Sequence, residues 1–266
     1  MMTTLRALVI AFSMYSKIPM PQFAWKDEEM KYMLCFFPFI GTAIGIVFLV
    51  AEWICRYLGF GNSFTAMVLF GMSSMPVPSR KAVLARIPIA RITASDALSS
   101  WRDREKRLEI LKDSHAGAFA VITACVYFLV LFGTMRQITE VNNRTAMYLL
   151  ACSYMVSRCL SGIGVITLPK ANASGTVAEF SRKAEDKKVH NILVIYLVIL
   201  AVVMIWIQPV WGVSMLGTAL LVFAFYRHKA MKYFGGTTGD LSGYFLCLCV
   251  IWMPLALAVV MMLYKV

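Results

Sequence analysis

Long apolar stretches, separated by shorter polar segments, recur along almost the whole chain. A helix that crosses a membrane needs roughly 20 mostly apolar residues, and six stretches meet or approach this length. A seventh begins at Ser63 and meets Pro76 and Pro78 partway along. We therefore expect an all-α, polytopic transmembrane helical bundle of about seven spans, the second of them atypical, in one domain over residues 1–266. The six clear stretches are 33–55, 117–133, 146–168, 190–207, 209–226 and 242–264.

Composition and charge support a surface that faces lipid. The chain of 266 residues is 60% hydrophobic and 15% charged, whereas a soluble domain carries roughly 25% charged residues. The net charge of +12 therefore favours basic loops beside membrane spans over a nucleic-acid surface, and we expect no nucleic-acid partner. Lys and Arg are dense in the connections 80–116, 169–189 and 227–241, and sparse in the alternate ones. This asymmetry predicts a cytoplasmic N-terminus and an external C-terminus in a cell (inner) membrane.

The first polar loop with candidate chemistry runs from Asp96 to Gly117. Helical spacing places Glu105, Glu109 and Lys112 on one face, with Asp113 directly after them. Asp96 and Asp113 are candidate ligands of Mg²⁺, which binds through few protein carboxylates together with water and substrate phosphates. The same pattern also fits an amphipathic helix that lies solvated on the membrane surface.

A glycine-rich segment, GGTTGDLSG at 235–243, directly precedes the last apolar stretch. Its backbone N–H groups and the helix N-terminus that follows are suited to approach a phosphate closely. Asp240 is a candidate metal ligand or N-cap. Glycine-rich turns before helices are common, so an ordinary turn is the alternative. The candidate phosphate-binding residues of the segment are Gly235, Gly236, Thr237, Thr238, Gly239 and Ser242.

Arg158 follows Ser157 inside an otherwise apolar stretch. An arginine at membrane depth is costly and normally faces a polar cavity, which suggests that Arg158 points into an active site and pairs with phosphate. Snorkelling to the membrane surface or a structural ion pair would account for it equally well.

Together these segments resemble the cobalamin synthase family, also called adenosylcobinamide-GDP ribazoletransferases. Five pieces of the chain match in the family's order and cover most of its length. They are FSMYSKIPMPQFAW with Lys17, CFFPFIGTAIG at 35–45, DALSSWRDREKRLEILKDSHAGAFAV at 96–121, MVSRCLSGIGVITLPKA at 155–171, and GGTTGDLSG at 235–243.

The resemblance implies a Mg²⁺-dependent membrane transferase that completes the lower loop of coenzyme B12. In that family α-ribazole, or its 5′-phosphate, attacks the cobinamide-linked phosphate of adenosylcobinamide-GDP; GMP leaves, and adenosylcobalamin or its phosphate forms. Association with other cobalamin-assembly enzymes is also implied. The implied catalytic residues are Asp96, Lys112, Asp113 and Arg158. Phosphate binding is assigned to Lys17 together with the residues of the glycine-rich segment. The implied metal ligands are Asp96, Asp113 and Asp240.

Residues of about 71–95 depart from the family. Its motif HLDGxxDxxD would place two further aspartates where this chain has Ile89 and Thr93, and only the last, Asp96, is present. The match resumes abruptly at Asp96, and a local reading-frame slip in the gene or its sequencing is our hypothesis for the segment. If the chain exists as written, loss of two expected metal ligands predicts little or no transferase activity, because each 1.4 kcal/mol of lost transition-state stabilisation is about tenfold in rate.

Two other functions fit parts of the pattern. A CDP-alcohol phosphotransferase acting on lipids shares the chemistry, but its multi-aspartate signature followed by an Ala-Arg pair is missing. A secondary transporter would place polar residues at mid-span between paired halves, whereas here they gather at one membrane face, with Arg158 a partial exception. The lower-ligand base, the number of metal ions and the oligomeric state stay open.

Overall fold

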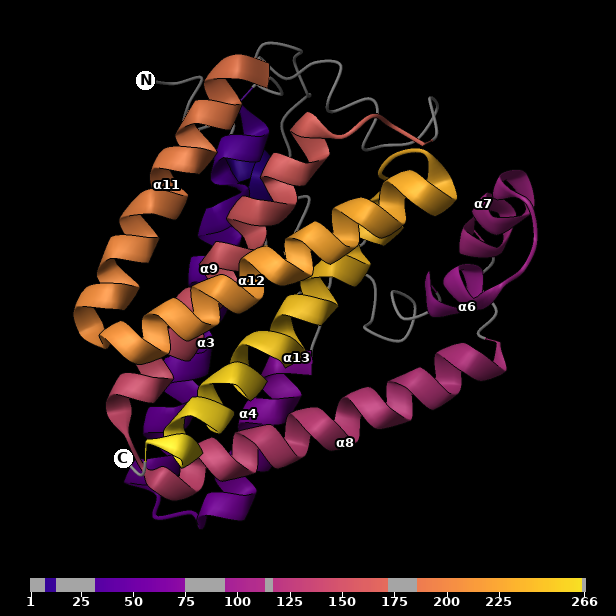
Figure 1. Cartoon of the computed structure of the whole chain (residues 1–266). Helices are drawn as coiled ribbons and strands as arrows, with labels where there is room; N and C mark the ends of the chain where they lie inside the picture. Colours follow the sequence, from indigo (N-terminus) through magenta and orange to yellow (C-terminus); the bar gives the residue numbers. More distant parts are fainter. Residues whose placement is uncertain (1–7, 13–31, 75–93, 113–116, 172–185, 265–266) are drawn as a thin grey trace.

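The computed structural model describes residues 8–12, 32–74, 94–112, 117–171 and 186–264, and in these ranges the regular structure is helical. Six helices are long and apolar enough to cross a membrane. The all-α, polytopic membrane architecture is therefore confirmed, and Figure 1 shows how the long helices pack side by side. The spans are η1 with α3 (Met33–Phe36 and Phe37–Tyr57), α8 (Ala118–Val141), α9 (Arg144–Thr167), α11 (Asp186–Ile207), α12 with η2 (Pro209–Lys229 and Ala230–Phe234), and α13 (Gly239–Leu263).

The expected seventh span corresponds to α4, Asn62–Ser74. Its 13 residues are short of the roughly 20 that a membrane span needs, and the segment from 75 to 93 lies outside the described residues. Which side of the membrane each end occupies stays a prediction.

Two expected connections turn out to be largely helical. The segment 134–145 belongs mostly to α8, which continues to Val141, and its last turns carry the paired side chains of Arg136 and Glu140 at 2.5 Å. In the 227–241 connection, α12 continues to Lys229 and is followed by the π-helical turn η2. The apolar pattern alone located the spans but ended them too early, because charged residues can extend a helix beyond the lipid.

Helix α9 lies at the centre of the bundle and contacts α3, α11, α12 and α13. Its approach to α3 is a backbone contact: a Cβ at Gly41 would lie 2.5 Å from the carbonyl oxygen of Tyr154, and one at Gly45 would lie 2.7 Å from that of Ala151. Small residues at this spacing let membrane helices pack closely without a water-driven hydrophobic effect. The GTAIG segment thus accounts for the α3–α9 pair.

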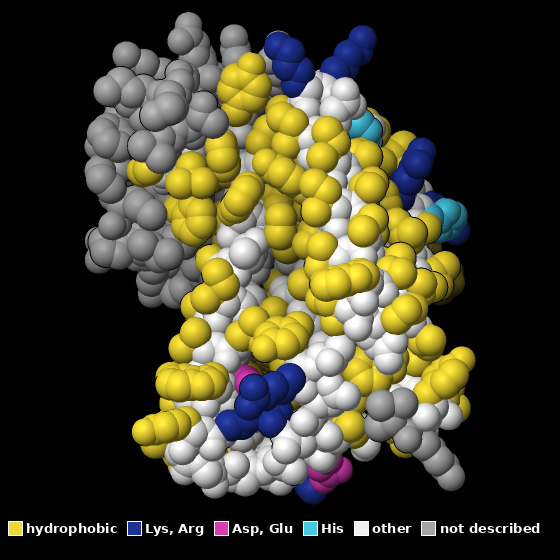
Figure 2. All heavy atoms as spheres, turned by 90° about the vertical axis from the view of Figure 1, so that its left-hand side faces the viewer, with side chains coloured by type: hydrophobic (Ala, Val, Ile, Leu, Met, Phe, Trp, Pro, Cys, Tyr) yellow, Lys and Arg dark blue, Asp and Glu magenta, His cyan; other side chains and the backbone are white. Residues whose placement is uncertain are grey.

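Large apolar side chains cover the outer face of the bundle, as Figure 2 shows for one side. Trp206 is 85% exposed and Leu221 is 72% exposed. A soluble protein would bury such side chains, whereas lipid accepts them.

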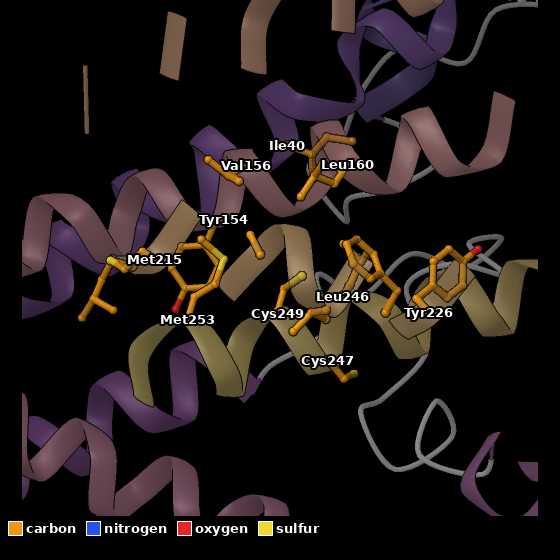
Figure 3. Close-up of a cluster of buried hydrophobic side chains, with 14 of the residues drawn as sticks. Ile40, Tyr154, Val156, Leu160, Met215, Tyr226, Leu246, Cys247, Cys249 and Met253 are labelled. Atoms are coloured by element: carbon orange, nitrogen blue, oxygen red, sulfur yellow. The ribbon is translucent and has the colours of Figure 1, made fainter. Parts of the chain in front are cut away.

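The interior is packed with apolar side chains from α3, α9, α12 and α13 (Figure 3). Trp211, Phe48, Phe234 and Phe245 are among its largest fully buried members. This core fixes where the polar ends of the same helices meet.

Candidate active site

Asp96 lies in α6 (Ala94–Ser99), a short helix that contacts both α8 and α13. Its Oδ2 accepts a hydrogen bond from the backbone N–H of Gly117 at 2.8 Å, and its Oδ1 accepts one from Ala120 at 2.8 Å. A carboxylate at this position satisfies first-turn N–H groups and complements the helix dipole. Asp96 therefore caps α8 from a distance in sequence. Each oxygen keeps a further lone pair, so the bonds do not conflict with metal binding.

Gly117 is the residue that this cap requires. A Cβ there would lie 2.9 Å from Oδ2 of Asp96, and the carboxylate would have to move away from the helix. Asp96 was a predicted site residue, but its contact with Gly117 has no signal in the sequence.

The glycine-rich segment closes back on the end of α9. The N–H of Thr237 donates to the carbonyl of Pro169 at 2.8 Å, and the N–H of Ala171 donates to the carbonyl of Thr237 at 3.0 Å. A Cβ at Gly236 would lie 2.3 Å from the same Pro169 oxygen, so only glycine fits. Gly235 has φ +64°, the left-handed conformation that ends η2. We call this contact between residues 169–171 and 235–237 the loop clasp.

The hydroxyl groups of the segment face inward. Thr237 and Ser242 are each 1% exposed, and their hydroxyl oxygens lie 3.2 Å apart. The phenol of Tyr226 lies 2.5 Å from Thr237 Oγ1 and 3.4 Å from Ser242 Oγ. This buried hydroxyl network joins α12, the loop and α13.

The start of α13 is capped by Thr238, whose Oγ1 accepts a hydrogen bond from the N–H of Leu241 at 3.2 Å. The N-cap alternative for Asp240 is therefore wrong: Asp240 lies in the first turn instead. Within the loop, the N–H groups of Gly235 and Gly236 donate to the carbonyls of Met231 and Ala230. A phosphate bound by this segment would meet the first turn of α13, which begins at Gly239, because a helix N-terminus favours an anion.

Basic side chains of α7 (Arg104–Lys112) lie against η2, which this helix contacts. The Arg104 guanidinium covers Gly235, where a Cβ would lie 2.6 Å from its Cζ. The Cζ of Arg107 lies 4.6 Å from the ring centroid of Tyr233, and the same ring has the Nζ of Lys229 at 5.0 Å and that of Lys232 at 5.4 Å. We call these four basic residues, three of them around Tyr233 and Arg104 at Gly235, the α7–η2 cationic cluster.

The guanidinium of Arg107 uses only some of its hydrogen-bond donors. Its Nε donates to the carbonyl of Arg102 at 2.6 Å, while its buried Nη1 has no hydrogen-bond partner among the described residues. A buried, unsatisfied donor on a cation is suited to an anionic ligand. The sequence analysis treated these residues as loop charge, because nothing in the local pattern indicates that α7 contacts η2.

Arg158 makes several contacts within its own helix. Its Nη1 donates to Ser157 Oγ at 2.9 Å and to the carbonyl of Tyr154 at 3.2 Å, and its Cζ lies 5.7 Å from the Tyr154 ring. It precedes the end of α9 at Thr167 by nine residues, about 14 Å along a helix. The structure thus does not place it beside the loop clasp, and its contact with phosphate stays a prediction.

Other predicted residues lie where the structure gives no side-chain contacts. Lys17 and Asp113 fall outside the described residues, and Lys112 is the last residue of α7, with no side chain described. The described ranges contain no group of three or more His, Cys, Asp or Glu side chains that could hold a metal. Of the predicted ligands, Asp96 and Asp240 lie on α6 and α13, which contact each other. Asp96 has the oxygen chemistry that Mg²⁺ prefers.

The fold defines a polytopic membrane protein with a candidate site where α6, α7, η2 and the start of α13 meet. The chain belongs to the Cobalamin-5-phosphate synthase family, whose model matches residues 7–75 and 94–258. The family expectation is thereby confirmed.

Relatives extend the match over nearly the full length. An adenosylcobinamide-GDP ribazoletransferase of Lachnoclostridium phytofermentans is 41% identical over 97% of this chain and 95% of its own. One of Clostridium botulinum (strain Alaska E43) is 28% identical over 90% of this chain and 91% of its own. One of Clostridium perfringens (strain ATCC 13124) is 29% identical over 91% and 93%. No solved structure matches.

The family match is interrupted between residues 75 and 94. This interruption falls inside the segment 71–95, where the sequence analysis predicts a departure from the family motif. Ile89 and Thr93 lie within it and outside the described residues. The reading-frame hypothesis stays a prediction, and resequencing of that stretch tests it.

Proposed function

We propose that this chain has the architecture and substrates of an adenosylcobinamide-GDP ribazoletransferase. The reaction joins α-ribazole, or its 5′-phosphate, to the cobinamide-linked phosphate and releases GMP. The observation that carries the proposal is the 41% identity to a ribazoletransferase over 97% of this chain. The polar features of α6, α7, η2 and the start of α13, which lie in contact, support it.

Substitution at a diphosphate needs positioning and charge neutralisation more than a protein nucleophile. The α7–η2 cationic cluster supplies positive charge, with the Nη1 of Arg107 available as a donor. The loop clasp and the hydroxyl network fix the start of α13 against the end of α9. Asp96 is held in one orientation by α8.

Mg²⁺ is part of the proposal, held by Asp96, Asp113 and Asp240. When bound, it would neutralise charge on the diphosphate. The proposal also places the protein in the cell membrane of a bacterium or archaeon, with this end facing the cytoplasm, where nucleotide-linked substrates are made. Association with other cobalamin-assembly enzymes remains an expectation.

The absence of two motif aspartates lowers the transferase rate that we expect. With Ile89 and Thr93 in place of two motif aspartates, we expect activity at least about a hundredfold below that of a chain carrying the full motif, which corresponds to about 2.7 kcal/mol of transition-state stabilisation. The low rate is compatible with the proposed function. The loop clasp and the α7–η2 cationic cluster would still position the substrate, whereas two of the expected metal ligands are absent.

The test compares two forms of the full chain in membranes. One is the chain as it stands, and the other carries HLDGxxDxxD at residues 87–96, with Ile87→His, Pro88→Leu, Ile89→Asp, Ala90→Gly and Thr93→Asp and with Asp96 kept. Membranes receive adenosylcobinamide-GDP, α-ribazole and Mg²⁺, and GMP and adenosylcobalamin are measured. We expect Mg²⁺-dependent products from the second form and little from the first. No product from either form would contradict the function, whereas equal rates would contradict only the role of the missing aspartates.

A further inference from the structure

A pocket of about 530 Å³ opens where α3 ends and α9 begins. Helix α9 runs over 24 residues from Arg144 to the end that carries the loop clasp, about 36 Å. The pocket and the candidate active site are thus separated by about the thickness of a bilayer. Nothing in the proposed reaction uses it.

The polar wall of the pocket is formed by Glu52, Arg56 and Arg144. Glu52 is 8% exposed and forms an ion pair with Nε of Arg56, whose Nη1 donates to Oδ1 of Asn142. The Arg56 guanidinium is therefore fixed from two sides. Figure 2 shows basic side chains beside a nearly covered acidic one, toward one end of an otherwise largely apolar face.

Arg144 leaves a positive charge without a counter-charge. In the described part of the chain it has no hydrogen bond or ion pair, and its charge is close enough to Arg56 for the two to repel each other. The single carboxylate of Glu52 balances one of these two cations. At a membrane edge, such an excess positive charge is expected to attract an anion.

The rest of the pocket is apolar and faces outward. Ile46 is 56% exposed, Val50 48% and Trp53 61%, at helical spacing along one side of α3. Trp53 also stacks on Tyr57, with ring centroids 5.6 Å apart, as aromatic residues do at headgroup level. From the end of α3 toward its middle, the side chains that line the pocket therefore change from basic to aromatic to aliphatic. A phospholipid has a matching order, from its charged headgroup to its apolar acyl chains.

We propose that this pocket binds a glycerophospholipid with a net negative headgroup. Its phosphate oxygens accept hydrogen bonds from Arg144 and from the outer edge of Arg56, and an acyl chain lies along Ile46 and Val50. A zwitterionic lipid carries its own cation, which Arg144 repels, so the site selects by net charge. This site is independent of the proposed transferase function.

The test uses the purified full chain in a neutral detergent, incubated with equal amounts of phosphatidylglycerol and phosphatidylcholine. Native mass spectrometry then counts the lipids retained. We expect the chain to retain phosphatidylglycerol preferentially. Arg144→Gln should reduce that retention about fivefold, the effect of one basic residue near an anionic surface, with phosphatidylcholine unchanged, and Arg144→Lys should retain most of it.

The matched control is Arg136→Gln. Arg136 is also an arginine at this end of the bundle, but it lies on α8, pairs with Glu140 and does not line the pocket. Its replacement should leave retention unchanged. Equal retention of the two lipids by the unaltered chain would overturn the proposal without any variant, and so would equal losses from the Arg136 and Arg144 changes. Complete displacement of phosphatidylglycerol by millimolar inorganic phosphate would show a free-anion site and would overturn the lipid assignment.

Discussion

The two ends of the bundle hold their polar side chains in different ways. At the end with the loop clasp, the partners are far apart in sequence: Asp96 bonds to the start of α8, and Thr237 to Pro169. At the opposite end, the ion pairs Glu52–Arg56 and Arg136–Glu140 each join residues four apart within one helix, and the long-range contact of Arg56 is a single hydrogen bond to Asn142. The first end is assembled only when the whole chain has folded, whereas each pair at the second end forms with its helix. A site that requires precise geometry lies at the first.

The largest expected effect is on activity at the clasp end. In the chain with the restored aspartate motif, Asp96→Asn removes the charge of the proposed metal ligand and weakens the cap on α8, and we expect at least about a hundredfold loss of GMP release. Asp103→Asn is the matched control, because Asp103 is exposed and its side chain has no contact among the described residues. Comparable losses in the two variants would show that Asp96 has no special role.

The next effect is on stability at the same end. Gly236→Ala forces a methyl group against the Pro169 carbonyl, and we expect a loss of about 2 kcal/mol, the scale of overpacking a tight site. Gly217→Ala, with nothing near its Cβ, should leave stability unchanged or slightly raised. Thermal unfolding in detergent compares the two, and an unaltered midpoint for Gly236→Ala would mean that the clasp does not form.

A smaller effect is expected from the hydroxyl network. Tyr226→Phe removes one member while Thr237 and Ser242 remain within hydrogen-bond distance of each other, so the loss should be about 1 kcal/mol. Tyr57→Phe, on a side chain that is 78% exposed at the other end, serves as the control. Thermal unfolding in detergent compares the two variants. A loss of stability in Tyr226→Phe no larger than that in Tyr57→Phe would show that the hydroxyl network does not stabilise the fold.

The smallest effect should come from the opposite end. The side chains of Arg136 and Glu140 are 49% and 43% exposed, and such solvent-screened pairs contribute little, so Arg136→Gln should change stability by less than about 0.5 kcal/mol. A destabilisation as large as that of Gly236→Ala would remove the distinction between long-range and local contacts.

The same distinction explains how much could be predicted from sequence. Apolar runs of spanning length located six helices, because lipid requires a continuous apolar surface and a fully bonded backbone. The helix ends at Val141 and Phe234 were missed, since charged residues there do not interrupt helical hydrogen bonding.

For the candidate site, the sequence offered residues but not the contacts among them. Asp96 and the glycine-rich segment were predicted from their residue types and positions before the family resemblance was considered, and Thr238 rather than Asp240 proved to be the N-cap. The packing of Arg104 and Arg107 against η2 had no sequence signal, because it joins segments more than a hundred residues apart that show no shared periodicity.

The glycine contact between α3 and α9 has a consequence for biosynthesis. Thr42 of α3 donates a hydrogen bond to the sulfur of Met155, 113 residues later. A ribosome that adds about 5–20 residues per second needs on the order of ten seconds to make that stretch. During this interval the flat face at Gly41 and Gly45 lies in the bilayer without its partner, open to other helices with small residues. Nascent α3 therefore presents a helix-packing face to the bilayer until α9 arrives.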